Sequence, residues 1–229
     1  HLLVQASTYL LFPLLIISLY PFIGVNSHSL WLAFLFLAAL PSTVSSSVVM
    51  VSIAKGNVAA AIFNASISGL IGIAVTPLWM GLFLHHSAAD FSLSQIYLKL
   101  LTEILLPVVL GLFLQKFLHR FVIRFARHLS LFDKCVVLLI IYKSFAESFE
   151  KKVFNTVSIP DLLIIAVGAG LLFYVVYGLT GLIAKSMKFN REDRITAQFC
   201  GTKKSLVHGT VFSKVLFPAS MPVGIILLP

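Results

Sequence analysis

The stretch Leu30–Gly56, LWLAFLFLAALPSTVSSSVVMVSIAKG, decides the fold of this chain. It starts as an apolar run that suits a lipid bilayer, and Pro41 followed by a cluster of hydroxyl side chains interrupts it. Proline removes a helical hydrogen bond and clashes with the preceding turn. Serine and threonine offer the backbone alternative partners. We therefore predict a membrane helix that breaks between Pro41 and Ser47.

A second stretch has the same character. FCGTKKSLVHG, from Phe199 to Gly209, places two adjacent lysines inside an apolar span, and we expect a break at Gly201–Ser205. Lys203 lies about 14 Å along a helix that starts at Arg194, which is near the middle of the membrane. Two interrupted spans, one in each half of a chain, indicate the binding site of a secondary transporter.

The composition agrees with a multi-pass membrane protein. The 229 residues are 59% hydrophobic and 11% charged, whereas soluble domains carry roughly 25% charged residues. Because an open sheet leaves its edge unpaired in lipid, we predict an all-α polytopic fold. The chain starts without methionine and stops inside an apolar run, so we expect a fragment, with an eighth span cut off near Met221. Seven spans are predicted: Leu2–Ile23, Leu30–Ala54, Asn57–Leu84, Ile96–Leu118, Lys134–Phe149, Leu162–Ala184 and Arg194–Phe217.

The formal charge of +9 follows the predicted topology. Lysine and arginine gather in the connection between the fourth and fifth spans and in that between the sixth and seventh, and the predicted outer loops Val25–Ser29 and His85–Gln95 contain neither. Positive residues mark cytoplasmic loops. The charge therefore indicates contact with anionic membrane lipid and argues against nucleic-acid binding.

Three segments carry a family resemblance: LPSTVSSSVVMVSIAKGNVAAAIFNASISGLIGI (40–73), LLIIYKSFAESF (138–149) and FCGTKKSLVHGTVFSKVLFP (199–218). They resemble the bile acid:sodium symporter superfamily, and within it the bacterial YfeH-type branch. The resemblance implies a multi-pass protein of the bacterial inner membrane. It also implies ten helices in two inverted five-helix repeats, with two broken helices that cross at mid-membrane.

On that template, residues 1–95 are core-domain helices three to five, with the break near 41–47. Residues 96–150 are panel-domain helices six and seven. Residues 160–229 are core-domain helices eight to ten, with the break near 201–205 and the last helix truncated.

The resemblance also implies site residues, and this sequence departs from the family pattern at several of them. Ser46 and Ser47 match the first sodium-binding segment. In the second, Phe199 stands where sodium-coupled members have glutamate, and Lys203 and Lys204 follow. Sodium prefers oxygen ligands, so we expect at least one ammonium to replace a bound cation, compensate broken helix ends or pair with an anionic substrate. The candidate substrate- or ion-binding residues are Ser45, Ser46, Ser47, Asn64, Thr202, Lys203, Lys204 and Ser205, and no catalytic or metal-ligating residue is predicted.

Structural roles compete with each of these assignments. Either lysine can extend into a water-filled crevice. The serines of the first break can simply bond the kinked backbone, and Thr202 and Ser205 can cap helix ends. A desolvated lysine favours its neutral form, so H⁺ coupling or uncoupled transport stands beside the family's Na⁺ coupling.

The sequence thus predicts a secondary active transporter of a small organic anion, bile-acid-like or another carboxylate, without a bound cofactor. A regulatory membrane protein of the same fold, acting on ion homeostasis without carrying a metabolite, is the alternative. No HExxH or GxSxG motif occurs in the spans, which argues against an enzyme.

Overall fold

Two of the long apolar segments are each split into a pair of shorter helices. The structure, a computed structural model, describes residues 1–23, 28–84, 98, 101–102, 106–150 and 159–217. Apart from one isolated β-bridge, the regular structure of these residues is helical. The helices are α1 (Leu2–Ala6), the π-helix η1 (Ser7–Leu11), α2 (Phe12–Ser18), α3 (Tyr20–Ile23), α4 (His28–Ala39), α5 (Ser45–Ile53), α6 (Val58–Leu84), α8 (Leu106–Arg124), α9 (Ala126–Glu150), α10 (Ile159–Ser186), α11 (Arg191–Thr202) and α12 (Leu206–Leu216).

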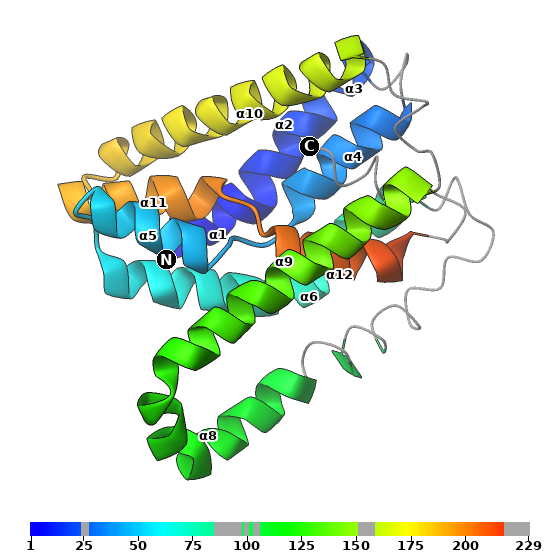
Figure 1. Cartoon of the computed structure of the whole chain (residues 1–229). Coiled ribbons are helices and arrows are strands. Elements are labelled where there is room, and N and C mark those ends of the chain that lie inside the picture. Colours follow the sequence, from blue (N-terminus) through cyan, green and yellow to red (C-terminus); the bar gives the residue numbers. More distant parts are fainter. Residues whose placement is uncertain (24–27, 85–97, 99–100, 103–105, 151–158, 218–229) are drawn as a thin grey trace.

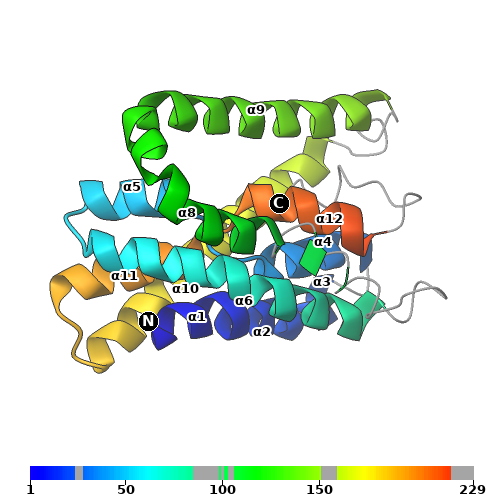
Figure 2. The same ribbon diagram turned by 90° about the horizontal axis from the view of Figure 1, so that it is seen from below.

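Most helices pack into one bundle, and α8 and α9 form a hairpin at its side (Figures 1 and 2). Within the bundle, α11 packs against α10, α6 and α5, and α4 packs against α2 and α6. The hairpin reaches the bundle through α9, which contacts α12. The split pairs α4–α5 and α11–α12 are therefore both part of the bundle, and α12 is also the helix that meets the hairpin.

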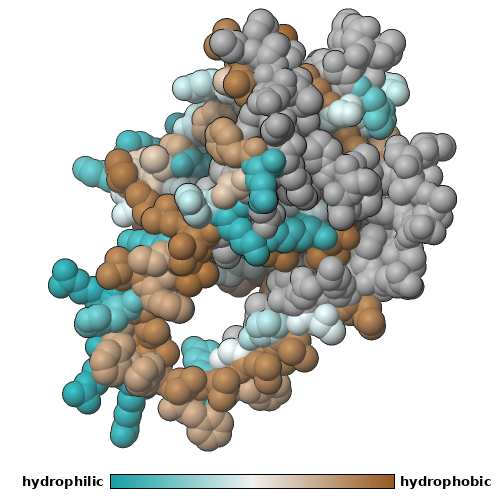
Figure 3. Space-filling view, turned by 45° about the vertical axis from the view of Figure 1, so that its right-hand side comes forward, coloured by the Kyte–Doolittle hydropathy of each residue, from teal (hydrophilic) through white to brown (hydrophobic). Residues whose placement is uncertain are grey.

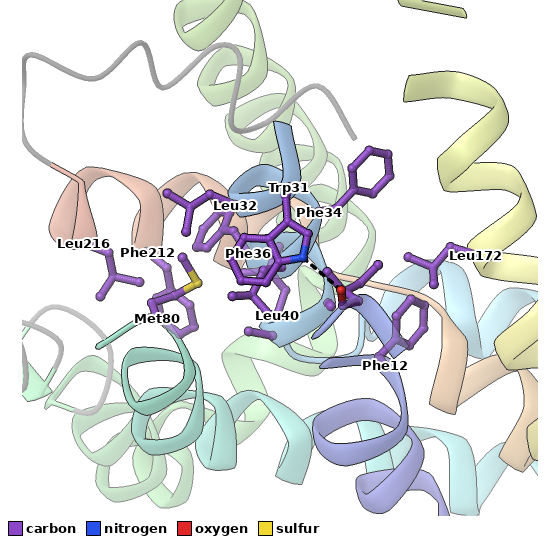
Figure 4. Close-up of a cluster of buried hydrophobic side chains, with 14 of the residues drawn as sticks. Phe12, Trp31, Leu32, Phe34, Phe36, Leu40, Met80, Leu172, Phe212 and Leu216 are labelled. Atoms are coloured by element: carbon purple, nitrogen blue, oxygen red, sulfur yellow. Dashed lines mark hydrogen bonds between the residues drawn. The ribbon is translucent and has the colours of Figure 1, made fainter. Parts of the chain in front are cut away.

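The core of the bundle surrounds α4, whose residues from Trp31 to Phe36 are all buried (Figure 4). Trp31 is 1% exposed, and its indole N–H donates to the carbonyl oxygen of Ile16 at 2.9 Å. Its ring meets that of Phe83 edge to face at 5.2 Å between centroids. A helix buried on all sides shows no amphipathic stripe, which explains why this segment is uniformly apolar.

The outer surface is apolar as well. Phe113 and Phe117 on α8 are 73% and 81% exposed, and apolar side chains cover much of the described surface in the view of Figure 3. Among the described residues, two segments are long and apolar enough to cross a membrane by themselves, Val58–Phe83 and Leu162–Ser186. Exposed apolar surface of this extent suits contact with lipid.

The basic residues gather at one end of the molecule. The α5–α6, α8–α9 and α10–α11 connections lie at the same end in both ribbon views (Figures 1 and 2). These connections carry Lys55, Arg124, Arg127, Lys188 and Arg191. The arrangement agrees with the charge-based topology, in which all three turns face the cytoplasm.

Several boundaries differ from the sequence prediction, and those of the two breaks matter most for the site. The first break spans residues 40–44, and Ser45, Ser46 and Ser47 are helical because α5 begins immediately after Val44. The second break is likewise shorter, since Gly201 and Thr202 complete α11.

The fifth predicted span begins too late. The helix α9 starts at Ala126, with only Phe125 between it and the end of α8, so the basic residues expected in a loop lie on the two helices. The backbone explains the tight turn, because Phe125 donates to Phe121 and accepts from Leu129 with helical spacing. The predicted outer loop His85–Gln95 and the eighth span near Met221 lie outside the described residues.

Candidate functional site

The two breaks cross each other. Ser42 and Lys204 form an isolated antiparallel β-bridge. On one side of it the N–H of Ser205 donates to the carbonyl oxygen of Pro41 at 2.9 Å, and on the other the N–H of Thr43 donates to that of Lys203 at 3.3 Å. Each unwound segment thus supplies backbone partners to the other, which buried irregular backbone requires.

Three carbonyl groups at or just after the end of α4 accept hydrogen bonds from side chains elsewhere in the fold. The last carbonyls of a helix have no partner within it, and Pro41 has no N–H to offer. The Ala39 carbonyl accepts from the hydroxyl of Thr76 at 2.7 Å. The remaining two, Ala38 and Leu40, accept from one side chain, that of Lys204.

The Lys204 ammonium has a complete set of partners. Its Nζ lies 2.6 Å from the Ala38 carbonyl oxygen, 2.9 Å from that of Leu40 and 2.8 Å from that of Thr8. An ammonium has three N–H donors, so all of them are used. It also lies 4.4 Å from the centroid of the Phe12 ring, a cation–π distance. The positive charge therefore sits at the negative end of the α4 dipole.

The Thr8 carbonyl is available because of a proline one turn later. Thr8 lies in η1, where a carbonyl pairs with the N–H five residues on. For Thr8 that residue is Pro13, which has no N–H. The neighbouring Tyr9 carbonyl, four residues before Pro13, accepts instead from the indole N–H of Trp79 at 2.9 Å. The Thr8 and Tyr9 carbonyls thus accept hydrogen bonds from the side chains of Lys204 and Trp79.

Lys203 is in a different position. The segment at the bridge is extended, and successive side chains of extended backbone point to opposite sides. Lys203 is half-buried, and its ammonium has no hydrogen bond or carboxylate partner among the residues that the structure describes. Its backbone lies next to Thr43. The next residue, Val44, is the N-cap of α5, and its side chain makes no capping hydrogen bond. The backbone of Lys203 is thus close to the uncapped N-terminus of α5.

The other predicted site residues divide into two groups. Thr202 donates to the Gln198 carbonyl at 2.7 Å, and Ser205 caps α12, accepting from the His208 N–H at 3.3 Å and bonding His208 Nδ1 at 2.8 Å. Both hydroxyls therefore serve helix ends. Ser45 and Ser46 are exposed at the start of α5.

Ser47 and Asn64 are buried, and their side-chain oxygens have no hydrogen-bond partner among the residues that the structure describes. The Asn64 amide nitrogen donates to the Ala60 carbonyl at 2.8 Å, which fixes its oxygen on the unpartnered side. The structure brings Lys203, Lys204 and Ser205 to the crossing and places Asn64 on α6, one helical turn before Ser68, whose hydroxyl accepts from the Ser42 N–H.

Sequence reasoning missed the contribution of the first span. Gln5, Thr8 and Ser42 also have buried oxygens without partners among the described residues. Tyr9 bonds the carbonyl of Ser68, whose hydroxyl accepts from the Ser42 N–H at 2.9 Å. Polar residues inside an apolar span are the signal that could have identified Gln5 and Thr8. Uncharged oxygens of this kind are the ligands that hard cations use.

Comparison with known proteins gives a consistent result. Residues 1–229 match a family described as the SBF-like CPA transporter family. The full chain is 37% identical to a protein of Escherichia coli named "Putative symporter YfeH" and covers 69% of it. It is 36% identical to an uncharacterized protein of Pseudomonas aeruginosa, with 69% covered. It is 28% identical to sodium/bile acid cotransporter 7 of Danio rerio, again with 69% covered. These matches confirm the resemblance that the three sequence motifs carry.

Proposed function

Because the chain belongs to the SBF-like CPA transporter family, we propose that it is a secondary transporter that moves a small organic anion by alternating access. The observation that supports this proposal most directly is the different treatment of two adjacent lysines. The Lys204 ammonium is bonded to three carbonyls, and that of Lys203 has no partner among the described residues.

Lys204 takes the place of a bound cation in this proposal. Backbone carbonyls from η1 and from the end of α4 surround its charge, as they would surround a metal ion. A lysine at the centre of a membrane helix costs roughly 2.5–3.5 kcal/mol on insertion scales. Three charge-assisted hydrogen bonds offset that cost. The crossing is thereby held together without a dissociable ion.

Lys203 and the start of α5 form the anion site. The Lys203 ammonium, which no described residue bonds, supplies one positive charge, and the uncapped N–H groups at the start of α5 supply partial positive charge. The exposed hydroxyls of Ser45 and Ser46 are further donors. A carboxylate accepts from all three kinds of group, which favours an organic acid as the cargo.

Alternating access then takes place between the bundle and the α8–α9 hairpin. We assign the hairpin to the panel domain and the crossing helices to the core domain of a ten-helix, inverted-repeat fold in the bacterial inner membrane. The hairpin contacts the bundle mainly through α9 and α12, and a small contact suits relative motion of two domains.

Proton-coupled or uncoupled transport follows from the fixed ammonium. A specific observation favours sodium coupling as the second candidate: within the described part of the chain, five buried side-chain oxygens have no hydrogen-bond partner. They could serve as sodium ligands. They belong to Gln5, Thr8, Ser42, Ser47 and Asn64.

The test is uptake by the complete protein in proteoliposomes, with a labelled bile acid and a labelled short carboxylate as probes. Each is offered under a sodium gradient, a pH gradient and no gradient. The proposal predicts saturable uptake of one probe without sodium, reduced at least about tenfold by Lys203→Gln because a charge-assisted bond is lost. The exposed Lys214 provides the matched control, Lys214→Gln. Uptake that is absent for every anion contradicts transport and supports the regulatory alternative.

A further inference from the structure

Two lysines adopt a backbone conformation that normally belongs to glycine. Lys55 and Lys188 each have φ of 57°, and they are the only described non-glycine residues with positive φ. None of the described glycines has one. Left-handed backbone is unfavourable for residues with a Cβ atom, so each lysine holds its place at a steric cost.

Both lysines end a helix in the same way. The backbone N–H of Lys55 donates to the Ser52 carbonyl at 3.1 Å, and the backbone N–H of Gly56 donates to the Val51 carbonyl at 2.8 Å. Lys188 and the residue after it repeat this pattern with the carbonyls of Lys185 and Ala184, both at 3.0 Å. This is the Schellman motif, whose left-handed position is usually glycine.

An asparagine then starts the next helix in both turns. The Asn57 side chain accepts from the N–H of Ala60 at 3.0 Å, and that of Asn190 accepts from Asp193 at 2.7 Å. The chain thus uses the sequence Lys-x-Asn twice, at residues 55–57 and 188–190.

The two turns lie side by side. The backbone N–H of Asn57 donates to the Glu192 carbonyl at 3.3 Å and to the Thr196 hydroxyl at 2.9 Å. The side-chain amide of Asn57 donates to Asp193 Oδ1 at 2.9 Å. A Cβ atom on Gly56 would lie 3.2 Å from the Glu192 carbonyl oxygen. The α5–α6 connection therefore packs against the start of α11, and the two connections that carry Lys55 and Lys188 lie at the same basic end (Figures 1 and 2).

This surface carries an excess of positive charge, because five basic residues stand beside two acidic ones, Glu192 and Asp193. None of its lysines or arginines pairs with a carboxylate among the described residues, and Asp193 is engaged by Asn57. All are exposed except Arg194, which is half-buried. They are Lys55, Lys185, Lys188, Arg191 and Arg194. The charge-based topology places this end at the cytoplasmic membrane surface, where anionic lipid is the abundant counter-charge.

We propose that the two Lys-x-Asn turns form a binding site for the phosphate of an anionic phospholipid in the cytoplasmic leaflet. Lys55 and Lys188 donate to the phosphate oxygens, one from each turn. Lys185 and Arg191 add charge at the rim. The site joins the α5–α6 and α10–α11 connections. Bound lipid therefore links the two broken-helix pairs at the cytoplasmic surface of the bundle.

The experiment uses the complete protein in nanodiscs of phosphatidylcholine, with and without phosphatidylglycerol. The double variant Lys55→Gly/Lys188→Gly removes both charges and places the residue that the turn prefers at each position. It should melt at the same or a higher temperature than the wild type in phosphatidylcholine, because left-handed strain is relieved. It should lose most of the increase in melting temperature that phosphatidylglycerol gives the wild type.

Two controls decide between lipid binding and general charge. Lys214→Gly removes one exposed lysine near the end of α12 and should keep the full phosphatidylglycerol effect. Soluble inorganic phosphate should give no comparable shift. If the double glycine variant folds poorly, Lys55→Asn/Lys188→Asn replaces it, since asparagine tolerates left-handed backbone. Full retention of the phosphatidylglycerol effect in either double variant overturns the proposal, and no outcome here depends on substrate transport.

Discussion

The ammonium of Lys204 donates to the carbonyl oxygen of Ala38 across 2.6 Å, although 166 residues separate the two in sequence. This contact joins the second break directly to the end of α4. With the bonds to Leu40 and Thr8, it makes one side chain the common partner of three carbonyls from two backbone segments, η1 and the end of α4. The integrity of the crossing therefore depends on a covalently attached cation.

Removing this charge should destabilise the protein. Lys204→Met leaves three carbonyls without their donor at a depth where water is scarce, and we expect the free energy of unfolding to fall by roughly 2–4 kcal/mol. Lys203→Met is the matched control and should change it little, since Lys203 has no bond among the described residues to lose. Thermal unfolding of the complete protein in detergent measures both. Equal losses in the two variants would show that the lysines are not distinct.

Substitution of Lys203, which should change stability little, should reduce anion uptake strongly. Lys203→Arg keeps the positive charge and should retain part of the uptake, whereas Lys203→Gln should lose most of it. Both variants should melt within a few degrees of the wild type. Uptake assays on protein of verified stability separate the two effects. An unchanged KM for the anion in Lys203→Gln would exclude direct contact with the substrate.

Thr76 supports the same helix end from a different side. Its hydroxyl donates to the Ala39 carbonyl at 2.7 Å in a fully buried position. Thr76→Val keeps the shape and removes the donor, so we expect a loss of about 1–2 kcal/mol in unfolding free energy. Ser66→Val, a change at an exposed position of the same helix, serves as the control and should cost less.

Gly56 is required by a close approach between the two turns. A Cβ atom there would lie 2.8 Å from Ile195 Cγ2 and 2.9 Å from Val51 Cγ1, as well as near a backbone oxygen. We expect Gly56→Ala to lower the unfolding free energy by roughly 1–3 kcal/mol through overpacking. Gly178→Ala, where nothing lies within 4 Å, should be neutral in the same unfolding assay. A neutral Gly56→Ala would mean that the turns can separate.

The breaks could be predicted from sequence because their causes are local. Pro41 and the hydroxyl side chains after it predict the first break, and apolar runs of sufficient length predict most of the helices. Boundaries were less accurate because charged residues such as Arg127 do not prevent a helix, and α9 continues through them.

The roles of the lysines could not be predicted in this way. Whether Lys203 or Lys204 points toward Ala38 depends on which side of an extended strand each occupies, and that follows from the pairing of Ser42 with Lys204. The third carbonyl comes from Thr8, whose availability depends on the π-helical register before Pro13. Both are tertiary facts that one segment's sequence does not contain.

The most direct test of the central claim, that the Lys204 ammonium replaces a coupling cation, is the melting temperature of the complete protein in sodium, potassium and choline salts at matched ionic strength. A ligand that binds only the folded state raises apparent stability. We predict no sodium-selective shift in the wild type and a sodium-selective shift in Lys204→Gln, where a vacant carbonyl site can accept the ion. A sodium shift in the wild type that Lys204→Gln leaves unchanged would contradict the claim.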